Sequence, residues 1–457
     1  NTFICCYCKL SERVIKGNKY IQTPKLVFWL IIFLIFPAVL CLYAYNPGIS
    51  TPDTYDTMVT NAHSIFGMYD WHPAFYCMFL KLILMIWDST YAVIIVQYLI
   101  WLYIMLEGLL FLRKKKLNDY VLLAIAAFSG INVGNFLHLN TIWKDIPHAL
   151  MILWICIILS KLASDFEEYK KKSYIYMELT IALIGLFFFR KNGVVTFFIV
   201  VAAMAIILRK NIKVWITLAV SSLLIFTIKG PIYNYFEIED PGKHGVYIGL
   251  SQDILGVYYA GGDVSERTMQ MINVMTGYNN AEYSYTPTWS RQSYDLDVDM
   301  GEFILNYIDT FIKNPITMIR AVIAREDAIW NIYMGQDTVL GCVNRIDTQD
   351  GKGEWNKYYP ERRLNSFFNS MYAFTSYSAN NQWINSIEWR SSLLTFLSLV
   401  TMFTILAVKG AGKYMIVFVP VVGHILSLIL SCGWSDFRYF WPLNLMNFYI
   451  LFYMLII

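Results

Sequence analysis

Two carboxylates and an imidazole follow the first long apolar segment of this chain in one short polar stretch. Asp53 and Asp56 lie about one helical turn apart, and His72 stands directly before a proline. The run Ser50-Thr51-Pro52-Asp53 is typical of a helix start, with a hydroxyl cap and proline at the first helical position. A carboxylate within hydrogen-bond reach removes the proton of a sugar or polyol hydroxyl. We therefore predict Asp53 as a general base oriented by Asp56 or His72. The alternative is that Asp53 only stabilises the helix dipole.

Three further clusters place cations at the ends of apolar segments. They are Trp143, Lys144 and Asp145; Arg190 and Lys191; and Asp436 and Arg438. A guanidinium fork suits a phosphate group, so Arg190, Lys191 and Arg438 are predicted to bind phosphate. The first cluster and Asp436 are predicted to contact substrate. A structural ion pair between Lys144 and Asp145, and interfacial anchoring by Arg438, are the alternatives.

Two other runs contain residue types that can bind metal ions. The acids of Asp295-Leu296-Asp297-Val298-Asp299 alternate, but neither the glycine nor the terminal acid of an EF-hand completes the loop. A solvated acidic segment is the prediction, and a divalent metal is not favoured. The run Cys5-Cys6-Tyr7-Cys8 indicates unpaired thiols on a cytoplasmic tail, with a metal or lipidation site as the alternative.

Composition shows what must position these residues. The chain is 57% hydrophobic and 15% charged, and apolar runs of about 17–22 residues recur along it. This pattern predicts an all-α polytopic membrane protein with about 10–11 transmembrane helices. The predicted spans are 26–45, 90–112, 120–138, 147–162, 175–190, 193–208, 213–229, 390–408, 414–431 and 436–456.

Lysine and arginine in the short loops predict the orientation. Basic residues before position 26, at 113–116 and at 170–172 place those segments in the cytoplasm. These loops agree only if 74–87, which carries Lys81, is a short interfacial helix rather than an eleventh span. Every unusual polar cluster then falls on the extracytoplasmic side.

The apolar runs and the distribution of charge also divide the chain into regions. We predict a cytoplasmic tail (1–25), an N-terminal transmembrane module (26–229) whose first outer loop (46–89) is catalytic, an extracytoplasmic domain (230–389) and C-terminal transmembrane helices (390–457). Residues 231–389 contain 20 acidic and 11 basic side chains, and the rest of the chain contains 13 and 25. An acidic, mainly helical domain is therefore expected to precede the last three helices of a basic membrane part.

Several short motifs together resemble the glycosyltransferase C superfamily. They are the acid-bearing first outer loop, Asp70-Trp71-His72-Pro73 at its end, Trp143-Lys144-Asp145, Arg190-Lys191-Asn192-Gly193, and Arg438-Tyr439-Phe440-Trp441-Pro442 at the last span. The chain looks most like bacterial relatives of protein O-mannosyltransferases and lipid A aminoarabinose transferases. The resemblance covers essentially the full chain.

The resemblance implies a transferase in a bacterial plasma membrane with an extracytoplasmic site. Its donor would be a polyprenyl-phosphate-linked sugar, its acceptor an envelope glycan, teichoic acid or protein, and no nucleic acid is expected. The family's catalytic acid maps onto Asp53, with Asp56 next. Asp53 and Asp56 are separated by two residues instead of forming Asp-x-Asp, so metal dependence does not carry over. A polysaccharide polymerase or ligase would depend on outer cations rather than Asp53, and a lipid-linked glycan transporter or flippase would carry polar residues in mid-helix.

Overall fold

The protein is described by a computed structural model that covers residues 21–240, 244–276, 285–288, 298–333, 358, 366–409, 412–433 and 435–457. In these ranges every regular element is a helix, and only isolated bridges join Ile49 to Thr141 and Tyr69 to Glu239. The predicted all-α fold is confirmed. Cys5-Cys6-Tyr7-Cys8, Asp295 and Asp297 lie outside the described residues, and Asp299 caps a helix by accepting a hydrogen bond from Glu302 N at 2.8 Å.

The helices of the bundle are long and apolar enough for a polytopic membrane protein. Six helical stretches of the described chain could each cross a membrane, and up to eight do so if each bent pair forms one span. The six are α2 (Thr23–Ala44), α5 (Thr90–Lys114), α8 (Asp145–Ser164), α12 (Ile212–Thr227) with its extension to Tyr235, η4 (Gly412–Phe418) with α23 (Val419–Ser431), and α24 (Phe437–Ile456). The bent pairs are α6 (Asp119–Ile131) with α7 (Val133–Leu139), and α21 (Gln382–Glu388) with α22 (Ser392–Lys409). The remaining predicted spans are the shorter apolar helices α10 (Ser173–Phe188) and α11 (Gly193–Ile207).

Helix α8 is the centre of the bundle. Its apolar window is 100% buried, against 28% for α2 and 22% for the stretch that contains α12. The helix packs against α5, α10, η4 and α24. Apolar composition alone does not separate these helices, because lipid accepts an apolar surface as readily as protein does; α2 and α12 leave most of their surface for lipid, whereas α8 leaves none.

One helix break shapes the bundle near the end that carries residues 46–89. Helices α6 and α7 meet at 62° at Asn132, whose side-chain oxygen accepts a hydrogen bond from the Asn135 backbone at 3.0 Å. This bond satisfies a backbone donor that the break releases, as non-helical backbone at membrane depth requires. The break leads the chain sideways into the connection that carries Trp143 and Lys144.

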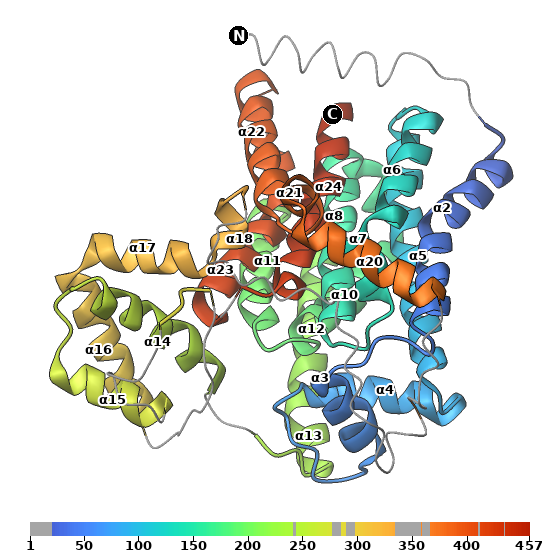
Figure 1. Ribbon diagram of the computed structural model, residues 1–457. Helices are drawn as coiled ribbons and strands as arrows, with labels where there is room; N and C mark the ends of the chain where they lie inside the picture. Colours follow the sequence, from blue (N-terminus) through green and yellow to red (C-terminus); the bar gives the residue numbers. More distant parts are fainter. Residues whose placement is uncertain are drawn as a thin grey trace.

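The first outer loop forms a compact set of short helices. It contains α3 (Pro52–Thr54), η1 (Tyr55–Thr60), η2 (Asn61–His63) and α4 (Ala74–Ile86). Figure 1 shows α4 lying crosswise below the bundle, at the end opposite to the start of α2 and the end of α24. Helix α4 is one of the shorter apolar helices of the described chain, and its interfacial placement stays a prediction.

The segment predicted as one domain divides between two cores. Helices α14 (His244–Tyr259), α15 (Glu266–Thr276), α16 (Met300–Lys313) and α17 (Pro315–Arg325) share their own apolar core and stand beside the bundle (Figure 1). We call these four helices the lateral domain. Residues of α18 (Asp327–Trp330) and α20 (Ser366–Asn380) instead join the bundle core.

Candidate functional site

The first outer loop is fastened to the connection between α7 and α8. Gly48 has φ +129°, and a Cβ there would lie 2.6 Å from Ile94 Cδ1 and 3.2 Å from the Asn140 carbonyl oxygen. The next residue, Ile49, donates its backbone N–H to that carbonyl at 2.9 Å. Only glycine combines this backbone conformation with so close an approach. The loop that carries Asp53 therefore has a fixed position against the connection that carries Lys144.

Thr51 anchors both the helix start and the neighbouring aromatic ring. Its hydroxyl and that of Thr54 form a reciprocal capping box at the start of α3. Trp143 Nε1 also donates to Thr51 Oγ1 at 2.6 Å, and Thr54 Oγ1 donates to the Ile142 carbonyl at 3.1 Å. The predicted helix start is thus confirmed, and its cap doubles as a contact to the next loop.

Asp53 is shared by two cations from distant parts of the chain. Its Oδ2 lies 3.2 Å from Lys144 Nζ and 2.8 Å from Arg438 Nη1. Burial by itself would raise the pKa of Asp53, but the charges of Lys144 and Arg438 outweigh it and hold the pKa well below its usual range. The side chain is 27% exposed and is a carboxylate throughout the physiological pH range.

Lys144 links Asp53 to the predicted His72 and Asp56. Lys144 Nζ lies 2.8 Å from His72 Nδ1, and His72 Nε2 lies 3.5 Å from Asp56 Oδ2. Because an ammonium group only donates, Nδ1 accepts and the imidazole proton resides on Nε2, facing Asp56. Burial, followed by the charge of Lys144, lowers the pKa of His72, so the ring is neutral near pH 7. Asp56 is the accessible member of the group, with 57% of its side chain exposed.

Arg438 is held by aromatic rings and acids together. Its guanidinium carbon lies 4.8 Å from the ring centre of Trp143 and 4.9 Å from that of Tyr439. Asp436 caps α24 through the Arg438 backbone N–H at 3.0 Å and approaches Arg438 Nε at 3.2 Å. Burial raises the pKa of Asp436 to about 6, although Arg438 opposes the shift.

Arg190 joins this group through a different acid. Arg190 Nη1 lies 2.8 Å from Asp145 Oδ1, and its guanidinium carbon lies 4.4 Å from the Tyr439 ring centre. Arg190 and Arg438 therefore contact the same ring. We call Asp53, Asp56, His72, Trp143, Lys144, Asp145, Arg190, Asp436, Arg438 and Tyr439 the outer cluster.

Lys191 does not follow Arg190 into these contacts. It lines a neighbouring pocket of about 230 Å³ together with Asp70, Pro73 and Lys229. Lys229 Nζ lies 3.1 Å from Asp70 Oδ2, while Asp70 Oδ1 accepts a hydrogen bond from the Ala74 backbone at 2.7 Å. The sequence predicts one phosphate site from both basic residues, whereas the structure directs them to adjacent sites that share the 70–73 loop.

The sequence predicts Thr51 only as part of the hydroxyl cap and Tyr439 only as part of the motif at the last span, and it indicates no role for Lys229. Tyr439 stands next to Arg438, and an aromatic ring beside an arginine is the one signal that pointed to it. Lys229 reads as the end of a span, because nothing in its neighbours along the chain indicates that Asp70 lies beside it. These contacts depend on the packing of the bundle.

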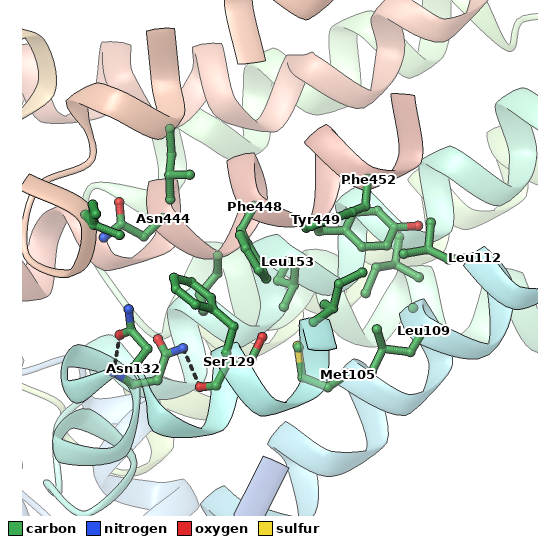
Figure 2. A pocket seen from close by; sticks show the side chains of 18 residues that line it. Met105, Leu109, Leu112, Ser129, Asn132, Leu153, Asn444, Phe448, Tyr449 and Phe452 are labelled. Atoms are coloured by element: carbon green, nitrogen blue, oxygen red, sulfur yellow. Dashed lines mark hydrogen bonds between the residues drawn. The ribbon is translucent and has the colours of Figure 1, made fainter. Parts of the chain in front are cut away.

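A narrow apolar cleft lies deeper in the bundle, below the outer cluster. Figure 2 shows its lining side chains, with Asn132 and Ser129 near one end and Leu112 and Phe452 near the other. Trp441 Nε1 donates to Asn135 Oδ1 of this lining at 2.7 Å, and the Trp441 ring stacks on His138 at 5.1 Å. His138 in turn lies 5.8 Å from Trp143, so an aromatic path joins the cleft to the cluster.

A wider apolar groove opens on the flank of the bundle. It has a volume of about 440 Å³ and is formed by α2, the junction of α6 and α7, and α20. Tyr45, which ends α2 just before the first outer loop, lies 3.3 Å from Thr375 of α20 through their hydroxyl groups. Phe374, which lines the groove, directly precedes Thr375 on α20.

In comparisons with known proteins, no family model, no curated protein and no solved structure matches this chain.

Proposed function

We propose that this chain is a membrane glycosyltransferase that moves a sugar from a polyprenyl-phosphate donor to an acceptor on the extracytoplasmic side of a bacterial plasma membrane. The observation that carries the proposal is the contact between Asp53 of the first outer loop and Arg438 of the last helix, with Lys144 on the same carboxylate oxygen. A base and phosphate-binding cations then occupy one site at the end of a membrane bundle. The acceptor would be a cell-envelope glycan, teichoic acid or protein.

The proposed reaction is a single inverting displacement. Asp53 accepts the proton of the acceptor hydroxyl, and the hydroxyl oxygen forms a bond to the anomeric carbon of the sugar. The bond from that carbon to the phosphate oxygen breaks, and its electron pair leaves with polyprenyl phosphate. Arg438 and Lys144 stabilise the negative charge that develops on the leaving group.

The contacts of Asp53 with Lys144 and Arg438 indicate how donor binding would control its basicity. A carboxylate that binds two cations is a poor proton acceptor, because its pKa is held low. A donor phosphate offers Arg438 and Lys144 a competing anion, and any weakening of their contact with Asp53 raises the basicity of that carboxylate. Donor binding would then activate the base at the moment when it is needed.

The apolar groove offers room for the lipid part of the donor. It is lined mainly by aromatic and aliphatic side chains of α2, the α6–α7 junction and α20, and Phe374 of its lining precedes Thr375, which contacts Tyr45. An isoprenoid chain binds such a surface through apolar contacts alone and needs no specific polar partner. Its phosphate would remain at the membrane boundary, where the cations of the outer cluster lie.

The test supplies the purified protein in vesicles with a radiolabelled polyprenyl-phosphate sugar and a cell-envelope extract as the source of acceptor, and it measures release of polyprenyl phosphate. Asp53→Asn is expected to lower the rate by about 10²-fold or more, because it removes the proton acceptor. The control is Glu168→Gln, which alters an exposed carboxylate at the opposite end of α8, paired with Lys114.

Equal rates for Asp53→Asn and the unaltered protein would reject the assignment of the base. Loss of activity only on substitution of Arg190 and Arg438 would instead favour a polymerase or ligase. A donor that crosses the membrane with its sugar–phosphate bond intact would indicate a transporter.

A further inference from the structure

The lateral domain touches the bundle through a buried arginine at the end of α17. Arg325 Nη2 donates to the Ile429 carbonyl at 2.7 Å, and Nη1 donates to the Cys432 carbonyl. Both carbonyls belong to the last turn of α23 and the residue after it. A single planar guanidinium therefore caps the end of this helix, where backbone oxygens lack helical partners.

The same residue is itself fixed by acids of the lateral domain. Arg325 Nε lies 2.8 Å from Asp253 Oδ1 on α14, and Nη1 lies 2.6 Å from Glu326 Oε1. Arg325, Asp253 and Glu326 are each 1% exposed or less. Nearly all N–H groups of the buried Arg325 guanidinium donate to one of two carboxylates or two carbonyl oxygens. The position of the side chain is therefore tightly determined.

The connection between α23 and α24 is also held by two hydrogen bonds of Ser435. Ser435 Oγ donates to the Arg325 carbonyl at 2.8 Å, and the Ser435 backbone N–H donates to the Thr288 carbonyl at 2.9 Å. The helix cap Asp436 follows at once, and Arg438 lies two residues further on. We call residues 432, 433, 435 and 436 the connecting loop.

Two glycines allow the close approach. A Cβ at Gly249 of α14 would lie 2.9 Å from the Cys432 carbonyl oxygen and 3.2 Å from Arg325 Nη1. A Cβ at Gly433 of the connecting loop would lie 1.8 Å from Ile248 Cγ2. The two surfaces are in contact at backbone distance, and side chains at these positions would separate them.

We infer that Arg325 is a positioning residue, through which the lateral domain sets the place of Asp436 and Arg438 in the outer cluster. The lateral domain carries none of the residues of that cluster. It holds the connecting loop, and the loop holds the cap and the guanidinium that contact Asp53. The catalytic meaning of this contact rests on the proposed function, whereas the mechanical coupling does not.

The coupling is tested by hydrogen exchange of the full-length protein in lipid nanodiscs. Arg325→Lys keeps the charge but cannot direct donors to Asp253, Ile429 and Cys432 at once. Gly249→Ala keeps the arginine side chain but adds a methyl group 2.9 Å from the Cys432 carbonyl oxygen and 3.2 Å from Arg325 Nη1, which forces the two surfaces apart. Each variant is expected to raise amide exchange in residues 432–440 by about tenfold or more, since a local opening that becomes easier exposes these amides more often.

Two matched variants serve as controls. Arg113→Lys alters another arginine with a carboxylate and a carbonyl partner, Asp119 and Ile21, at the far end of α5. Gly412→Ala adds a methyl group where no described atom lies within 4 Å. Neither is expected to change exchange in 432–440. Unchanged exchange there in Gly249→Ala would overturn the inference, even if Arg325→Lys fails to fold.

A kinetic measurement separates this inference from the proposed function. With the labelled polyprenyl-phosphate sugar as probe, Gly249→Ala is expected to raise KM at least fivefold while kcat falls less, because a displaced Arg438 weakens phosphate binding first. If the unaltered protein neither binds nor cleaves the probe, the proposed function fails. The exchange measurement still decides whether the lateral domain holds the loop.

Discussion

At the scale of single residues, Asp53 and Asp436 show opposite responses to a buried environment. Both carboxylates touch Arg438, but Asp53 has Lys144 as a second cation. The two charges outweigh burial at Asp53, whereas burial prevails at Asp436 and raises its pKa to about 6. Titration near neutral pH therefore belongs to Asp436 and not to Asp53.

This difference predicts how stability depends on pH. Because the pKa of Asp436 is higher in the folded protein than in an unfolded chain, its ionisation costs folded-state stability as pH rises through about 6. Asp436→Asn keeps a good helix cap without that cost. We expect it to be more stable than the unaltered protein at pH 8, by about 1–3 kcal/mol, and equally stable at pH 4. Thermal unfolding at both pH values checks this, and a variant less stable at pH 8 would contradict it.

Individual residue types were predictable from the sequence where the chemistry is local. Asp53, Lys144 and Arg438 were singled out by their positions at the ends of apolar segments, and they do meet. The divergence of Arg190 and Lys191 was not predictable, because neighbouring residues in a turn point to different sides. The pairing of His72 with Lys144 depends on where the α6–α7 break leads the chain.

At the scale of elements, Gly48 decides how the first outer loop meets the α7–α8 connection. Gly48→Ala introduces both an unfavourable backbone conformation and a contact of 2.6 Å with Ile94 Cδ1. The expected loss of stability is about 1–3 kcal/mol, with a weaker hold on Asp53. Unfolding in detergent solution and the transfer rate measure the two effects.

Gly67→Ala is the matched control for Gly48→Ala. Gly67 also has a left-handed conformation, with φ +69°, but no described atom lies within 4 Å of the added Cβ. It reports the backbone cost alone, about 1 kcal/mol. If Gly48→Ala were no more damaging than this control, close packing of the loop against α5 and α7 would not be what fixes it.

Most helices were predictable from apolar runs, but their breaks were not. The run 120–138 reads as one span because its average hydropathy is high, yet Asn132 divides it into α6 and α7 at 62°. The amide stabilises the bend by capping α7, a role that a hydropathy average does not register. The lateral domain was predicted as helical, but its separate core depends on long-range contacts such as Tyr247 with Phe303.

At the scale of the whole molecule, basic loops and the outer cluster lie at opposite ends of the bundle. Arg113 and Lys114 lie in the last turn of α5, and Lys172 lies directly before α10. In each case the length of the helix separates the basic residues from the outer cluster. The charge distribution predicts that this basic end faces the cytoplasm. The outer cluster would then face the outside.

Cysteine labelling tests this orientation. After replacement of Cys5, Cys6, Cys8 and Cys342, we introduce Gly67→Cys or Lys172→Cys, because the remaining four cysteines are buried. In intact cells an impermeant maleimide is expected to label position 67 only, and position 172 only after permeabilisation. The reverse pattern would place the outer cluster in the cytoplasm and remove the basis for an extracytoplasmic acceptor.

The complete enclosure of α8 has a consequence for biogenesis. A membrane segment with no lipid-facing side has no stable resting place until its neighbours arrive, and one of these neighbours, α24, is synthesised last among the described helices. Nascent chains lacking α24 would leave one flank of α8, including Ser160, whose hydroxyl meets that of Tyr449, open to lipid. Cellular quality control would thus recognise an interrupted polypeptide by its incomplete centre, well before any catalytic defect became visible.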